Sequence, residues 1–175
     1  MIVCGCLMLV VVVAAGYLLF APQPAHVISV PARLDTYVKE PTLDSSTAQA
    51  LRSKIVAGAA GEVKNVVAGV YEETSGPGTA DGPQIIVFIG GNLTGGGSAG
   101  GFIGGFMTQL AGSFTTSPGG LGGQAACAPG ANGGPVECAW ADDDTFGVIV
   151  SATLSAPGLA SEMRQMRPLV EHPAR

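Results

Sequence analysis

Apolar residues follow different patterns along this chain, and the first pattern is an unbroken run. Residues 2–21 read IVCGCLMLVVVVAAGYLLFA, and Pro22 and Pro24 follow them. About 20 apolar residues in a helix span the hydrocarbon core of a bilayer, and proline ends a helix. We therefore predict a transmembrane helix at 1–21 that meets the lipid bilayer through residues 2–21. The alternative is a cleaved signal peptide, although no basic residue precedes the run.

Beyond a Pro-containing spacer expected at 22–30, the pattern changes to that of a folded domain, expected at 31–175. Helical spacing of apolar residues predicts a helix that follows the cap residues at 42–46 and ends at Gly58 and Gly61, a second helix at 99–110 and a third after Ser155. Valine-rich or continuous apolar runs predict strands at 63–73, 84–90 and 146–153, the second of them central in a sheet. In the last helix, Arg164 and Arg167 are expected to face water, and Pro168 is expected to kink or end it. Together these elements predict an α+β fold, an antiparallel sheet with packed helices.

The stretch from Cys127 to Ser151 predicts a hairpin whose two strands are joined by a disulfide. Turn-forming Gly, Pro and Asn residues separate Cys127 from Cys138, and Asn132-Gly133 is a strong hairpin signal. Alternation then places Cys138 and Trp140 on one face of a strand. We interpret the two cysteines as a disulfide with Trp140 in the core beside it. Two free buried thiols or a metal site are the alternatives, and neither histidine is near in sequence to supply a further ligand.

Three consecutive carboxylates, Asp142, Asp143 and Asp144, lie between two strand-like runs. Oxygen ligands of this kind suit a hard cation such as calcium, so the three are weak candidate metal ligands. The alternative is a hairpin turn exposed to water. We favour the turn, and we expect no structural metal and no cofactor.

Charge is scarce in this chain and unevenly placed. Only 12% of the 175 residues are charged, the net charge is -5, and 27 residues are glycine. No Lys or Arg occurs between Lys64 and Arg164, and nothing charged occurs between Asp81 and Glu137. A nucleic-acid partner is therefore not expected, because it needs a basic patch.

The glycine-rich tract at 90–105 does not predict a nucleotide site. It has no Gly-Lys-Ser/Thr sequence, and no acidic residue follows at the spacing of a dinucleotide-binding loop. We interpret the tract as a loop that enters the helix at 99–110, with a second membrane span as the alternative. It also contains the glycosylation sequon Asn92-Leu93-Thr94.

Several of these motifs together resemble a known group of proteins. They are Cys127, the Cys-x-Trp-x-Asp element at 138–142, Thr145-Phe146-Gly147-Val148 and the segment 163–171, with 31–37 and Val70-Tyr71 before them. In this order they resemble the C-terminal extracytoplasmic domain of actinobacterial single-pass membrane proteins of unknown function. The resemblance implies a bacterial cell-membrane location, and a cytoplasmic part upstream of the membrane helix. It implies no activity.

The function expected from these observations is that of a membrane-anchored domain outside the cytoplasm that binds or interacts without catalysis. The alternatives are a structural subunit of a membrane assembly, or a cell-surface hydrolase. A hydrolase needs a base near a nucleophile, and we interpret His26 and His172 as surface residues. A protein partner is expected, and the sequence does not identify it.

Overall fold

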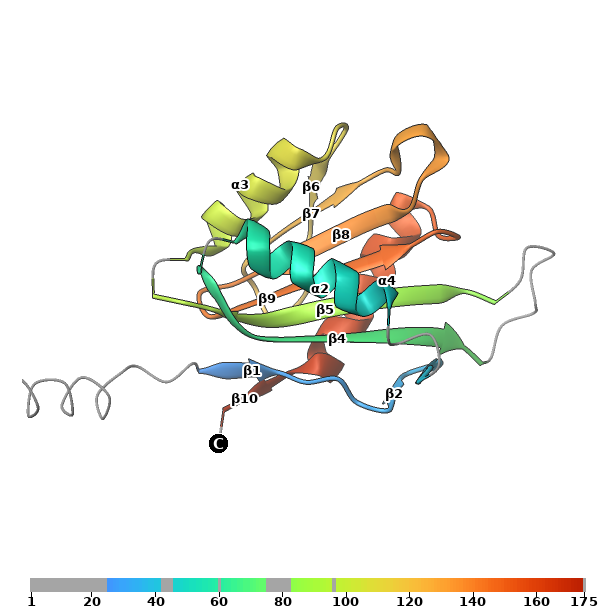
Figure 1. Cartoon of the computed structure of the whole chain (residues 1–175), viewed down its shortest axis with the longest axis horizontal. Coiled ribbons are helices and arrows are strands. Elements are labelled where there is room, and N and C mark those ends of the chain that lie inside the picture. The colour runs from blue at the N-terminus through green and yellow to red at the C-terminus, as the bar shows by residue number, and fades with distance from the viewer. Residues whose placement is uncertain (1–24, 42–45, 60, 75–82, 96, 175) are drawn as a thin grey trace, which may run out of the picture.

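The structure is a computed structural model that describes residues 25–41, 46–59, 61–74, 83–95 and 97–174. Within these ranges, eight strands form one antiparallel sheet, in the order β2-β3-β4-β5-β9-β8-β7-β6 (Figure 1). The strands are β2 (Arg33–Leu34), β3 (Tyr37–Lys39), β4 (Val63–Glu73), β5 (Ile85–Leu93), β6 (Phe114–Thr116), β7 (Gln124–Ala128), β8 (Val136–Ala141) and β9 (Thr145–Ser151). A second antiparallel pair joins β1 (His26–Ile28) to β10 (Glu171–Pro173). The predicted α+β class with an antiparallel sheet is confirmed.

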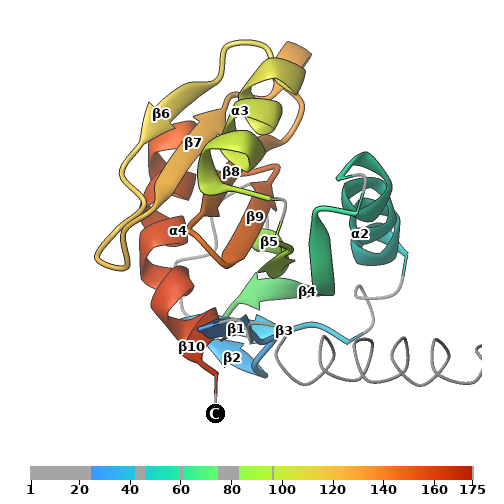
Figure 2. The same cartoon turned by 90° about the vertical axis from the view of Figure 1, so that its left-hand side faces the viewer.

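Helices cover both faces of the large sheet (Figure 2). On one face lie α2 (Thr47–Gly58) and α3 (Ala99–Gln109), which share a core with β5 and β9 through residues such as Leu51, Ile103 and Val148. On the other face α4 (Ala156–Val170) packs Leu159 and Met163 onto the aromatic side of the sheet. The apolar run expected as a central strand is therefore β5, which is covered on both sides, as its lack of alternation predicts.

The predicted transmembrane helix at 1–21 lies outside the described residues. In the part of the chain that the structure describes, no helix is both long enough and apolar enough to cross a membrane. The stretch 22–30, expected as a spacer, contains β1. Because β1 pairs with β10, this part of the stretch belongs to the folded domain.

Helix α4 begins as predicted, but its second half differs from the prediction. Ser155 caps it by accepting a hydrogen bond from the amide of Gly158. Pro168 does not end the helix, which continues for two more residues to Val170. Arg167 does not face water either, since its side chain is 1% exposed. It lies four positions after the buried Met163 and three before the buried Val170, so it shares the face of α4 that packs on the sheet.

The predicted hairpin is formed by β7 and β8, and its cysteines form a disulfide. Cys127 and Cys138 are opposite each other in the strand register, and a disulfide joins them. In the turn, Asn132 and Gly133 both have positive φ, 55° and 79°, the conformation for which this dipeptide is favoured. Trp140 lies in the same buried cluster as both cysteines, and its ring stacks on Phe88 with 5.9 Å between centroids.

Candidate functional site

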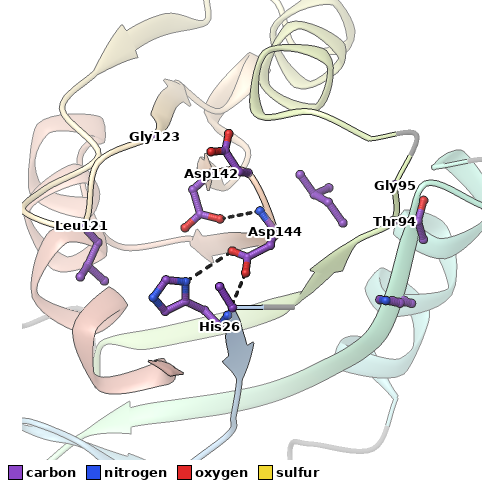
Figure 3. Close-up of a pocket in the computed structure, with 11 residues that line it drawn as sticks. His26, Thr94, Gly95, Leu121, Gly123, Asp142 and Asp144 are labelled. Atoms are coloured by element: carbon purple, nitrogen blue, oxygen red, sulfur yellow. Dashed lines mark hydrogen bonds and ion pairs between the residues drawn. The ribbon is translucent and has the colours of Figure 1, made fainter. Parts of the chain in front are cut away.

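A shallow cavity of about 560 Å³ opens at the end of the sheet where β8 turns into β9 (Figure 3). Its walls come from the turn 142–144, from the start of β1, from the start of β4, from the end of β5 and from the loop that joins β6 to β7. These segments are far apart in sequence. The turn 142–144 forms one wall of the cavity, and it contains the three aspartates considered above as metal ligands.

Asp142 holds this turn in shape. Its Oδ1 accepts hydrogen bonds from the backbone amides of Asp144 (3.0 Å) and Thr145 (2.7 Å), and from the Thr145 hydroxyl (3.0 Å). Burial by itself would raise the pKa of Asp142, but the hydrogen bonds that the carboxylate accepts outweigh it and lower the pKa to about 2. The carboxylate therefore stays ionised at neutral pH, with its oxygen atoms already occupied.

Behind the turn, the guanidinium of Arg167 lies between two carboxylates. Its Nη2 donates to Oδ2 of Asp142 at 2.8 Å, and its Nε donates to Oε2 of Glu171 at 2.8 Å. Nη1 donates to the carbonyl oxygens of Pro118 (3.2 Å) and Gly122 (2.6 Å). Arg167 and Glu171 are each 1% exposed. The cluster thus joins α4, the β8–β9 turn and the β6–β7 loop into one rigid wall behind the cavity.

The titration of Glu171 reflects this buried position. Burial raises the pKa of the Glu171 carboxyl, and the charge on Asp142 adds to the rise. The hydrogen bond and the positive charge of Arg167 act in the opposite direction. Two carboxylates that share one cation in a buried place therefore have pKa values that move apart.

Asp144, in contrast, holds the start of β1. Its Oδ2 accepts from the backbone amide of His26 at 2.8 Å, and its Oδ1 lies 3.4 Å from Nδ1 of the same residue. In Figure 3 the imidazole and the carboxylate face each other at the mouth of the cavity. The side-chain amide of Asn92 donates to the His26 carbonyl (2.8 Å) and the Asp144 carbonyl (3.1 Å). The start of β1 is therefore held against the turn.

Asn92 was noted in the sequence only as part of a sequon. In the fold it is 1% exposed, and its Oδ1 accepts a hydrogen bond from Asn65 at 3.2 Å. A buried side chain with its amide engaged on both sides is not accessible to glycosylation once the domain has folded. The sequon is therefore a structural bridge in the folded protein.

Two charged groups on the cavity wall remain available. The side chains of Asp143 and Lys64 are exposed, and neither has a hydrogen-bond or ion-pair partner among the described residues. The one hydroxyl on the described wall belongs to Thr94, and it donates to the Gly61 carbonyl at 3.2 Å. The wall therefore presents one free negative charge and one free positive charge, while its hydroxyl is held by the backbone.

The aspartate run does not gather further metal ligands in the described residues. No group of three or more His, Cys, Asp or Glu side chains in that part of the chain is arranged to hold a metal ion. The carboxylate of Asp142 accepts hydrogen bonds within the turn, and that of Asp144 accepts one from the start of β1. That Asp142, Asp143 and Asp144 bind no metal remains a prediction.

The sequence pointed to the turn but missed the groups that complete its surroundings. Arg167 and Glu171 are four residues apart, a spacing that places them together on a helix, yet nothing local indicated that this pair is buried. His26 and Asn92 reach the turn through long-range contacts. The sequence contains no signal for these contacts.

Comparison with known proteins leaves the chain without an assigned relative. No protein-family model matches it, and neither the curated proteins nor the solved structures contain a significant match.

Proposed function

We propose that this chain is a membrane-anchored domain outside the cytoplasm, and that it acts by binding a partner and not by catalysis. The observation that carries the proposal is the disulfide between Cys127 and Cys138. Both cysteines are 0% exposed, so the bond is part of the core. Disulfides persist in oxidising compartments and are rare in the cytoplasm. The apolar run at 2–21 supports a membrane anchor for a domain in such a compartment.

The chemistry of the cavity supports binding over turnover. The carboxylate oxygens of Asp142 and Asp144 accept hydrogen bonds from backbone amides, and the Thr94 hydroxyl donates to a carbonyl. The free charges of Asp143 and Lys64 remain for a partner. A general base and a nucleophile work only when they lie within hydrogen-bond reach of each other. The Asp142, Asp144 and Thr94 side chains of the cavity wall instead form hydrogen bonds with the backbone around them.

The location is tested with the full chain in a bacterial host. Carbonate-washed membranes should retain the protein, and a thiol-reactive reagent should label Cys127 and Cys138 only after unfolding and reduction. A soluble, shortened chain would contradict the anchor. Free Cys127 and Cys138 thiols in the unfolded but unreduced protein would contradict the oxidising location.

The binding role is tested by capture from detergent extracts of the membrane. The wild-type chain should retain a protein partner that the double variant Asp143→Ala, Lys64→Ala loses. Arg164→Ala is the matched control, because it removes a charge outside this cavity. Retention of the same partner by the double variant would show that the cavity is not the binding surface.

A further inference from the structure

The two edges of the large sheet differ in how they are protected. An edge strand exposes unpaired amides and carbonyls, so natural proteins shorten it, charge it or interrupt it with proline. The β2 edge is short and charged, and a proline precedes it. It is two residues long, includes Arg33, follows Pro31 and is followed by Asp35 with φ 53°. The β2 edge is therefore closed to a further strand.

The β6 edge is also short, with three residues and Pro118 two positions beyond them, but unlike the β2 edge it has no charged residue. Its sequence, Ser113-Phe114-Thr115-Thr116-Ser117, contains β-branched and aromatic residues but no charge and no proline. Phe114 is 40% exposed, and Thr115 is exposed as well. In Figure 2, β6 is the outermost strand of the sheet at its end, with no described element beyond it.

The register shows which backbone groups of β6 are open. The Cα atoms of Cys127 and Cys138 are 4.0 Å apart, which is the close spacing of a non-hydrogen-bonded antiparallel pair. The amide and carbonyl of Cys127 therefore point the other way, towards its β6 partner Phe114. Because the direction alternates along a strand, the amide and carbonyl of Thr115 point away from β7, to the open edge.

We infer that β6 pairs antiparallel with β6 of a second copy of this chain, with the two-fold axis at Thr115. In such a pair the amide of each Thr115 donates to the Thr115 carbonyl of the other copy. Phe114 then lies opposite Thr116 of that copy, and aromatic residues pair well with β-branched ones across strands. Two large sheets become one continuous sheet.

The partner is a second copy because of the charge distribution. A two-fold axis places each residue near its own equivalent, and like charges directly opposite each other destabilise a strand pair. Self-association of two copies through the same surface is therefore favoured when that surface has no charge. The stretch between Asp81 and Glu137 has none, and it includes β6 and both segments that flank it.

The first experiment measures the mass of the full chain in mild detergent by light scattering. The wild type should be a dimer. Thr115→Pro should weaken dimerisation at least tenfold, because it removes the outward amide of both copies and no hydrogen bond to β7. Thr115→Ser is the matched control and should dimerise like the wild type. Trp140 fluorescence verifies that each variant is folded. A wild-type monomer at all concentrations, or a folded Thr115→Pro variant that dimerises like the wild type, overturns the inference.

The second experiment tests the symmetry. Thr115→Lys alone and Thr115→Glu alone should each dimerise more weakly than the wild type, because like charges meet on the axis. Differently tagged copies of the two variants, mixed together, should form a heterodimer. If the mixture associates no better than either variant alone, the self-pairing is refuted. Crosslinking of Thr115→Cys to a different protein, in a Cys4→Ser, Cys6→Ser background, would refute it as well.

Discussion

Replacing Arg167 with methionine removes the cation at the centre of the wall behind the cavity. Methionine is similar in length and suits a buried position, so the change concerns charge and hydrogen bonds more than volume. All five guanidinium N–H groups have partners: three hydrogen bonds go to the carboxylates of Asp142 and Glu171, and two go to backbone carbonyls. The variant leaves the buried Glu171 carboxylate and the partly buried Asp142 carboxylate without a counter-charge.

The expected cost is large for a single substitution. Removing one partner of a buried ion pair typically costs about 3–5 kcal/mol, and Arg167 and Glu171 are both 1% exposed. With a urea m-value of about 2 kcal/mol/M, the unfolding midpoint should fall by roughly 1.5–2.5 M. Trp140 is the only tryptophan, and its ring centroid lies 6.0 Å from the guanidinium carbon of Arg167, so its fluorescence reports the transition.

Two further variants separate charge from packing. Arg164→Met, on the same helix and without a described partner, should change stability by about 0.5 kcal/mol or less. Adding Asp142→Asn and Glu171→Gln to Arg167→Met should recover part of the loss, because the unpaired charges are then removed. The reasoning is refuted if Arg167→Met and Arg164→Met lower the midpoint equally, or if the triple variant is no more stable than Arg167→Met.

Three other substitutions test the core and the turn. Cys138→Ser should lower the free energy of unfolding by about 2–5 kcal/mol, measured by urea unfolding against the wild type; an unchanged midpoint would show that the bond contributes nothing. Gly147→Ala should cost about 1–3 kcal/mol, because the added methyl group meets the buried Trp140 ring, whereas Gly104→Ala, where the methyl group meets only open space, should not destabilise. Asp142 has its pKa lowered from 3.8 to about 2, so its contribution of about 2 kcal/mol is present above pH 4 and is lost as the pH falls towards 2. Asp142→Asn should remove that part of the acid dependence, and a wild-type stability that is flat between pH 4 and 2 would argue against the shift.

Much of the local structure was predictable because its signals are local. The strand predicted at 63–73 is β4 with the same bounds, since a valine-rich run between turn residues is sufficient to indicate it. The last helix begins at the cap that its sequence indicates, and its buried stripe follows the helical period. The pairing of Cys127 with Cys138 followed from turn residues that lie between them. Each of these inferences needs only neighbours along the chain.

The surroundings of the cavity depended on contacts that no local pattern contains. The pairing of β1 with β10 brings the two described ends of the chain together, across residues more than 140 positions apart. Arg167 was expected in water because charged residues usually are. It is buried because Asp142 and Glu171, with two carbonyl oxygens, replace the water that it loses.

The sequence by itself therefore determined the three described helices, the longer strands, the disulfide-linked hairpin and the charge-free middle of the chain, because periodicity, turn chemistry and composition are properties of the chain alone. The tertiary structure decided which polar groups are engaged and which are free: Asp142 and Asp144 became supports of the turn, and Asp143 remained on the surface. It also decided that the charge-free segment forms an open sheet edge at β6. The physical reason is that the cost of burying a polar group depends on the partners it finds, and those partners come from distant parts of the chain.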